Sequence, residues 1–169
     1  MKETVAVLVN IRSAWNVGSM FRTADAAGIS KLYLVGYTPT PLDRFGRIRP
    51  DLAKVSLGAE TSMPWEHVPS AGRLLSRLSS EGYVVCAVEQ GRSAQPFTRF
   101  RSPKKTALVL GNEVRGLPPS ILARADHILE IPMRGALVRD ANHPRRTGVG
   151  KESLNVAVTF GIIAFHVVR

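Results

Sequence analysis

The segment Leu108-Val109-Leu110-Gly111-Asn112-Glu113-Val114-Arg115-Gly116-Leu117 decides the fold class of this chain. It opens with apolar residues, as a buried strand requires, and then turns at once to glycine, amide, carboxylate and guanidinium groups. Packing alone does not call for these polar groups, and the carboxyl edge of an open parallel sheet is where ligands bind. We therefore interpret the segment as a buried strand that carries polar side chains to a functional site. The alternative is an ordinary strand-to-helix turn in which glycine supplies unusual dihedrals.

Similar apolar runs recur along the chain, separated by stretches with helical periodicity. The predicted strands cover residues 5–9, 31–35, 83–88, 106–110 and 127–131. The predicted helices cover residues 16–27, 70–81, 118–124 and 153–168. This alternation predicts an α/β fold with a mainly parallel sheet flanked by helices. A length of 169 residues is that of one domain, so we expect a single domain over residues 1–169.

The charge balance indicates a polyanionic partner. Lysine and arginine number 23 against 13 aspartates and glutamates, which gives a net charge of +10. Such a field attracts nucleic acid and supplies sequence-independent affinity through phosphate contacts. No apolar run is long enough for a membrane span, and the only cysteine, Cys86, lies inside an apolar run, so we expect a soluble protein of the reducing cytoplasm. The four histidines are scattered, which argues against a metal site.

Three regions depart from the regular pattern. Residues 36–66 are rich in proline and basic residues and predict a long basic loop with one short helix near residues 50–56. Residues 136–150 contain several arginines and almost no core-forming residues, which predicts a basic loop that either contacts nucleic acid or is disordered. The predicted helix over residues 153–168 has too many apolar faces for one core, so we expect it also to pack on a partner subunit.

Known nucleotide-binding signatures do not match this chain. Gly111 and Gly116 have the spacing of a phosphate loop, but Leu117 and Pro118 stand where lysine and serine or threonine must follow. No Gly-x-Gly-x-x-Gly run follows a predicted strand either, which removes the usual dinucleotide fingerprint.

What remains are three polar clusters, each at the end of an apolar strand. The first is residues 10–23, where Asn16 and Arg22 lie about a turn and a half apart on one predicted helix and could face one cleft, unless Asn16 only caps that helix and Arg22 is solvated. The second is the opening segment. The third is residues 131–133 together with residues 152–158, where Ser153 or Asn155 could simply be a helix N-cap.

Together the three clusters resemble the SpoU family of the SPOUT class of RNA 2′-O-ribose methyltransferases, and the resemblance covers nearly the whole chain. The first motif of that family is similar to Asn10, Asn16, Gly18, Arg22 and Thr23. The second is similar to Leu110-Gly111-Asn112-Glu113-x-x-Gly116-Leu117, and the third to Ile131-Pro132-Met133 followed by Ser153-Leu154-Asn155-Val156. Within such a family, residues 136–150 would be an insertion beside the cofactor site.

The resemblance implies S-adenosylmethionine as methyl donor, a deep trefoil knot in the C-terminal half and an obligate homodimer with its sites at the subunit interface. The residues implied to hold the cofactor are Glu89, Leu110, Gly111, Ile131, Met133, Ser153 and Leu154, with Gln90 as the alternative to Glu89 near the ribose. The implied catalytic side chains are Asn16, Arg22, Glu113, Ser153 and Asn155. The basic residues expected to contact RNA are Arg12, Arg22, Arg44, Arg47, Lys54, Arg115, Arg145 and Arg146.

The resemblance therefore implies S-adenosylmethionine-dependent methylation of a ribose 2′-hydroxyl in RNA, with tRNA preferred over rRNA because only basic loops and the dimer surface are available for recognition. Family models make Arg22 the base, whereas an arginine hardly ever loses its proton, so we favour a charged Arg22 that stabilises the developing alkoxide. A catalytically silent RNA-binding module and a base methyltransferase are the alternatives.

Overall fold

The computed structural model describes residues 2–134 and 153–169. Within these residues, seven strands form one sheet in the order β3-β2-β1-β6-β4-β7-β5, and every pairing is parallel. The strands are β1 (Glu3–Val9), β2 (Lys31–Val35), β3 (Trp65–Val68), β4 (Val84–Val88), β5 (Gln95–Pro96), β6 (Lys105–Leu110) and β7 (His127–Glu130). The predicted α/β class and parallel sheet are confirmed, and the described residues form one domain.

The central strands are apolar throughout because both faces of the sheet are covered. On β1, for example, Ala6 and Leu8 belong to one hydrophobic core, whereas Val5 and Val7 belong to the other. Successive side chains of a strand point to opposite faces, so a strand buried on both faces reads as a continuous apolar run. This is why the apolar runs alone located the central strands.

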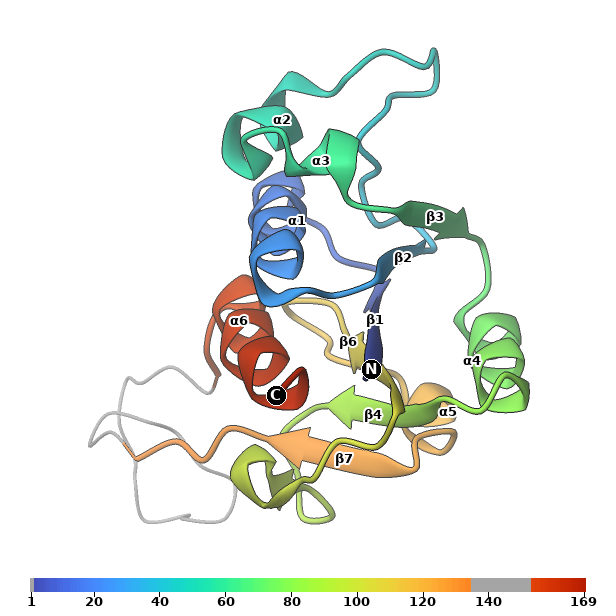
Figure 1. Ribbon diagram of the computed structural model, residues 1–169, viewed down its shortest axis with the longest axis vertical. Coiled ribbons are helices and arrows are strands. Elements are labelled where there is room, and N and C mark those ends of the chain that lie inside the picture. Colours follow the sequence, from blue (N-terminus) through green and yellow to red (C-terminus); the bar gives the residue numbers. More distant parts are fainter. Residues whose placement is uncertain (1, 135–152) are drawn as a thin grey trace.

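Helices cover both faces of the sheet (Figure 1). On one face lie α1 (Ala14–Ala27) and α6 (Val156–Val167), whose buried residues join the first core. On the other lie α4 (Ala71–Ser80) and α5 (Pro119–Leu122), which contribute to the second. The short α2 (Pro50–Ser56) and α3 (Ala59–Ser62) pack beside α1. The result is a three-layer α/β/α arrangement with the carboxyl ends of the strands at one edge.

The helix ends follow the capping residues of the sequence. Ser13 caps α1 and Gly28 ends it with φ of 80°, while Ser70 caps α4 and Asn155 caps α6. The alternative that Asn16 caps the first helix is therefore wrong, because the Ser13 side chain accepts the hydrogen bond from the Asn16 backbone. The last helix begins at Val156 and not at the predicted residue 153, because the side chain of Asn155 caps its N-terminus.

Residues 36–66 contain more regular secondary structure than the predicted loop with one short helix. The short helix was correctly expected, as α2, but α3 and the first half of β3 also fall in this range. Strand β3 is a four-residue edge strand that directly follows Pro64 and has no buried residue, so it lacks the apolar run that marks the central strands. The two-residue β5 and the 3-10 turn η1 (Phe97–Arg99) escaped prediction because they are short and only partly buried.

Gly18 allows α1 and α2 to pack closely. A Cβ atom on Gly18 would lie 2.6 Å from the carbonyl oxygen of Leu52 and 3.1 Å from the Cβ of Val55. The glycine of the first motif thus has a packing role. Residues 135–152 lie outside the described residues, so the trefoil knot expected in the C-terminal half and the predicted insertion over residues 136–150 both stay predictions.

Candidate functional site

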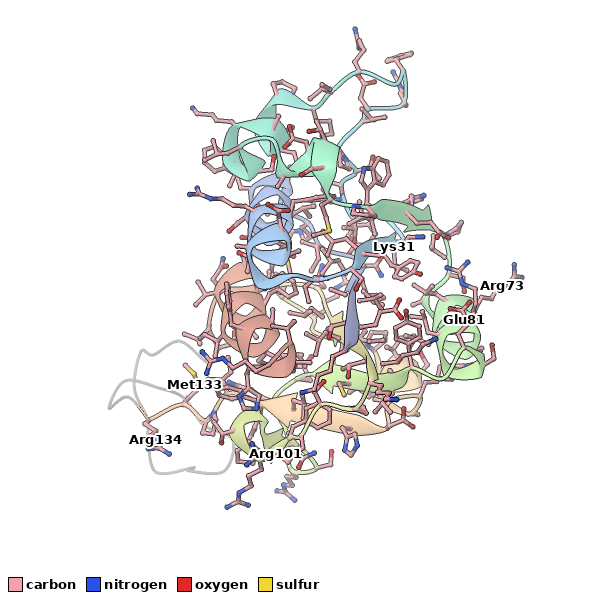
Figure 2. All side chains as sticks on the ribbon, in the orientation of Figure 1. Lys31, Arg73, Glu81, Arg101, Met133 and Arg134 are labelled. Atoms are coloured by element: carbon pink, nitrogen blue, oxygen red, sulfur yellow. The ribbon has the colours of Figure 1, made fainter. Side chains whose placement is uncertain are left out.

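A cavity of about 150 Å³ opens at the carboxyl ends of β4, β6 and β7, against the N-terminus of α6. This is the edge at which parallel sheets bind ligands. Figure 2 shows Met133 and Arg134 on the extended segment that follows β7, near α6. The lining residues are Val88, Glu89, Gln90, Leu110, Gly111, Asn112, Glu113, Gly116, Leu129, Glu130, Ile131, Met133, Ser153, Leu154, Asn155, Val156 and Thr159.

All of the residues expected to hold a cofactor lie in the wall of this cavity: Glu89, Leu110, Gly111, Ile131, Met133, Ser153 and Leu154. Of the expected catalytic residues, Glu113, Ser153 and Asn155 also line it. Asn16 reaches it through hydrogen bonds, whereas Arg22 is exposed on α1 and is not part of the lining. One chain therefore brings together every expected cofactor-binding and catalytic residue except Arg22.

Glu113, Asn16 and Asn155 form a relay of hydrogen bonds that joins three elements. The Nδ2 of Asn16 donates to Oε1 of Glu113 at 2.9 Å, and the Nδ2 of Asn155 donates to Oδ1 of Asn16 at 3.1 Å. At the far end, Oδ1 of Asn155 accepts from the backbone amides of Ala157 and Val158 at 2.9 and 3.3 Å. The relay holds the loop after β6, the first turn of α1 and the start of α6 in one arrangement.

Glu113 is ionised in this arrangement. Besides Asn16, its carboxylate accepts from the backbone amides of Arg12 and Ser13 at 2.9 and 3.1 Å. Burial acts to raise the pKa of Glu113, but the hydrogen bonds from Arg12, Asn16 and Ser13 together outweigh it and hold the pKa below its ordinary value. The carboxylate therefore serves as an acceptor that anchors the loop after β1.

Asn112 shapes the loop that follows β6, a role that the sequence alone did not reveal. Its buried side chain donates to the carbonyl oxygen of Asn10 and to the hydroxyl of Tyr37, both at 2.9 Å. Its Oδ1 accepts from the backbone amides of Val114 and Arg115, also at 2.9 Å. Asn112 was recognised as a polar residue at a strand end, but its contacts depend on which strands become neighbours.

Two glycines keep this loop tight against Glu89. A Cβ atom on Gly111 would lie 2.5 Å from the carbonyl carbon of Gly116, and one on Gly116, whose φ is 64°, would overlap the Glu89 carboxylate. That carboxylate accepts a hydrogen bond of 2.9 Å from the backbone amide of Leu117. A larger residue at either glycine would push Glu89 or the loop out of place.

The described lining carries one sign of charge. Glu89, Glu113 and Glu130 supply carboxylates, and no lysine, arginine or histidine of the described residues lines the cavity. Glu130 was not expected in the site, although its place at the end of strand β7, next to Ile131, is a signal that could have found it. An acidic and apolar cavity in a chain of net charge +10 suits a ligand that carries positive charge.

The residues expected to contact RNA lie on the outside. Arg12, Arg22, Arg44, Arg47, Lys54 and Arg115 are exposed, whereas Arg145 and Arg146 lie outside the described residues. Arg12 and Arg115 belong to the loops that hold Glu113, so two exposed arginines come from the segments next to the acidic cavity. A surface of this kind fits a polyanion that approaches the cavity from outside.

Other functional classes find little support in the described part of the chain. Residues 2–134 and 153–169 contain no group of three or more histidine, cysteine, aspartate or glutamate side chains that could hold a metal ion. None of the described helices is both long and apolar enough to cross a membrane. Cys86 is fully buried, and burial raises the pKa of its thiol to about 12, so it is a core residue and not a nucleophile.

The profile of the SpoU rRNA Methylase family matches residues 3–138. The chain belongs to the SpoU methylase family. It is 28% identical over 163 residues to the 23S rRNA (guanosine-2′-O-)-methyltransferase RlmB of Salmonella typhi. The match covers 96% of this chain and 58% of that relative. The chain thus spans little more than half the length of the curated relatives of this type.

Solved structures of SpoU relatives share the fold. An rRNA methyltransferase from Sinorhizobium meliloti, solved with AdoMet bound, superimposes with a TM-score of 0.80 at 26% identity, covering 98% of this chain and 55% of that one. A second structure, described as "Structural insights into the 2-OH methylation of C/U34 on tRNA", has a TM-score of 0.74 at 27% identity. The superposition covers 98% of this SpoU chain and 94% of the chain in that structure.

Proposed function

We propose that this SpoU chain transfers a methyl group from S-adenosylmethionine to a ribose 2′-hydroxyl of RNA. The observation that carries the proposal is the contrast between an acidic, apolar cavity and a basic exterior. The cavity fits a cationic cofactor and the exterior fits a polyanionic substrate, and methyl transfer between the two is the activity for which the family members compared above are named.

The lining of the cavity fits S-adenosylmethionine chemically. Apolar side chains such as Leu129, Ile131 and Leu154 can cover a purine, and the backbone near Leu110 and Gly111 can hydrogen-bond its edge. Glu89 and Glu130 place negative charge where a cation would be held. When bound, the cofactor supplies a methyl group on a positively charged sulfur.

The side chains of the relay would position the substrate. Methyl transfer needs an in-line arrangement of donor and acceptor, and correct positioning contributes several kcal/mol to lowering the barrier. Asn16 and Asn155 are fixed by Glu113 at one end and by the N-terminus of α6 at the other. They would therefore offer rigid polar groups beside the cavity, which Ser153 also lines, for the ribose that carries the reacting hydroxyl.

Arg22 would act from a second subunit. It is exposed on α1 and away from the cavity of its own chain, so a role in catalysis requires that it reach a cavity on a partner. The exposed apolar residues Val158, Ile162 and Phe165 lie at helical spacing on α6 and would supply a homodimer interface. A guanidinium keeps its proton, so Arg22 would stabilise the developing alkoxide and grip the adjacent phosphate.

We favour tRNA as the substrate. This chain is 27% identical to the protein whose solved structure is described by methylation of C/U34 on tRNA, and the match covers 98% of this chain. The exposed basic residues, among them Arg12 and Arg115, would contact that RNA.

The experiment combines binding with mapping of the product. Calorimetry with S-adenosylmethionine tests the cofactor, and mass spectrometric mapping of tRNA and rRNA from cells with and without the protein tests the product. Loss of a ribose methylation in tRNA is the expected result. If S-adenosylmethionine does not bind, the silent RNA-binding module is favoured. If the protein methylates a nucleobase and leaves the ribose unmodified, it is a base methyltransferase. If cells without the protein lose a ribose methylation in rRNA only, rRNA is the substrate.

A further inference from the structure

The connection between β2 and α2 carries a small hairpin that the proposed chemistry does not use. Leu42 and Ile48 form an antiparallel bridge, and the tip between them presents Phe45 with 65% of its surface exposed. Single exposed apolar residues are common on protein surfaces, so what sets this ring apart is the pair of guanidinium groups beside it. In Figure 1 this connection projects beyond α2 and β3, at the opposite end of the molecule from β7.

Two guanidinium groups flank the Phe45 ring. The central carbon of the Arg44 guanidinium lies 4.8 Å from the ring centroid, and that of Arg47 lies 5.0 Å from it. Both distances are typical of cation–π contacts. The hairpin thus gathers three planar groups, two of them positively charged, on one exposed surface, which we call the Phe45 platform (Arg44, Phe45 and Arg47).

Asp43 makes the platform rigid. Its Oδ1 accepts from the backbone amides of Phe45 and Arg47 at 2.8 and 2.9 Å, and its Oδ2 accepts from Nε of Arg47 at 3.0 Å. The backbone of Asp43 also accepts from Gly46 at 3.0 Å and donates to Arg47 at 2.8 Å. An aromatic ring held in place before binding loses little conformational entropy when a ligand stacks on it.

We propose that the Phe45 platform stacks an unpaired RNA base while Arg44 and Arg47 contact the neighbouring phosphates, an inference that rests on the proposed RNA substrate. Aromatic rings and guanidinium planes are the surfaces on which proteins stack splayed-out bases, and bases inside a duplex are not available to them. The positive charge excludes a basic partner, and the planarity of all three groups fits a base better than an aliphatic ligand. The platform thus selects RNA that presents an unpaired nucleotide.

The test measures RNA affinity without any methyl donor, so that binding is separated from catalysis. The probes are a fluorescent oligouridine and an RNA duplex of equal length, titrated with the wild-type protein and with Phe45→Ala, Phe45→Trp and Ile48→Ala. Ile48 is a matched control because it is an exposed apolar residue of the same hairpin without a ring. Phe45→Ala should weaken binding of oligouridine by between about 5-fold and about 140-fold, with little effect on the duplex. Phe45→Trp and Ile48→Ala should bind as the wild type does.

Arg44→Gln gives a second readout that does not depend on the ring. It should lower the slope of log affinity against log salt concentration by about 0.7 for the single-stranded probe. The platform is overturned if Phe45→Ala binds oligouridine like the wild type, if Phe45→Ala and Ile48→Ala lose the same affinity, or if the wild type binds neither probe. If the wild type transfers methyl groups and Phe45→Ala binds oligouridine as the wild type does, the proposed function stands and the platform is wrong. If the wild type transfers no methyl group but Phe45→Ala loses affinity for oligouridine, the platform stands and the proposed function is wrong.

Discussion

Asn155 donates a hydrogen bond of 3.1 Å to Asn16 across 139 positions of the chain, and this contact has a fixed direction. Glu113 can only accept, so Asn16 must turn its amide nitrogen to Glu113 and its oxygen to Asn155. The helix N-terminus can only donate, so Asn155 must turn its oxygen to α6 and its nitrogen to Asn16. The Glu113 carboxylate and the N-terminus of α6 thus orient the two amides from opposite sides.

Substitutions of Asn155 should separate its two roles. Asn155→Ser keeps a capping oxygen, so the free energy of unfolding should stay within about 0.5 kcal/mol of the wild type, but the short side chain gives up Asn16 and single-turnover methyl transfer should fall at least about 10-fold. Asn155→Ala should lose the same activity and about 1 kcal/mol of stability as well. Full turnover by Asn155→Ser would show that the contact with Asn16 does not matter for the chemistry.

The ionisation of Glu113 predicts how stability depends on pH. Because its pKa is lowered on folding, the carboxylate stabilises the folded state above its unfolded pKa of about 4.3, and this contribution is lost as the pH falls towards the lower folded pKa. Glu113→Gln should reduce the free energy of unfolding by about 1–3 kcal/mol at pH 7, and the difference from the wild type should shrink below about pH 4. Urea denaturation at several pH values measures it.

Two controls sharpen that measurement. Other carboxylates with lowered pKa, such as Glu66 and Asp51, titrate in both proteins and therefore cancel in the difference. Glu81→Gln alters an exposed carboxylate outside the contacts of Glu113 and should change the free energy of unfolding at pH 7 by no more than about 0.5 kcal/mol. A difference between Glu113→Gln and the wild type that stays constant down to pH 3 would mean that Glu113 acts by packing and not by charge.

The sequence located the central strands because strands buried on both faces are continuous apolar runs. Their ends indicated the ligand-binding edge of the sheet, whereas the individual cofactor residues in the cavity wall were implied by the resemblance to the SpoU family. The contacts of Asn112 and the presence of Glu130 in the wall escaped prediction because they follow from the strand order, which places β6 between β1 and β4. Periodicity carries no information on that order. Edge elements such as β3 and β5 escaped it because they are short and bury little.

Gly18 should tolerate no side chain, although it sits in a helix where alanine is normally preferred. A Cβ atom there would press on the Leu52 carbonyl oxygen at 2.6 Å, so Gly18→Ala should push α2 away from α1 and lower the free energy of unfolding by about 1–3 kcal/mol. Gly72→Ala is the matched control, because the nearest atom to its added Cβ is 3.7 Å away on the flexible Arg124 side chain. It should be neutral or stabilising by up to about 1 kcal/mol. Equal effects of the two variants in thermal or urea denaturation would rule out the close approach as the cause.

A side chain at Gly116 should weaken cofactor binding, in addition to straining the backbone at this positive-φ position. Gly116→Ala places a methyl group on the Glu89 carboxylate, so affinity for S-adenosylmethionine in calorimetry should fall at least about 10-fold. Gly82→Ala is its control, since Gly82 also has positive φ, 85°, but an added Cβ meets nothing within 4 Å. Both variants should lose about 1 kcal/mol of stability from left-handed strain. Unchanged cofactor affinity in Gly116→Ala would remove Glu89 from the proposed binding site.

Mixing two inactive variants should restore activity if Arg22 serves the partner subunit. Arg22→Ala lacks the guanidinium and Asn155→Ser lacks the contact at the cavity, so each homodimer should be nearly inactive. In a mixed dimer, one of the two sites combines an intact cavity from one chain with an intact Arg22 from the other. Equal amounts of both chains, once exchanged, form mixed dimers in half of the population, so methyl transfer should recover to about a quarter of the wild-type rate.

Adding Ile162→Arg to both chains puts a charge on the exposed apolar face of α6 and should abolish the recovery while producing monomers in sedimentation. No recovery in mixtures that sedimentation shows to have exchanged would mean that Arg22 does not act across the subunits.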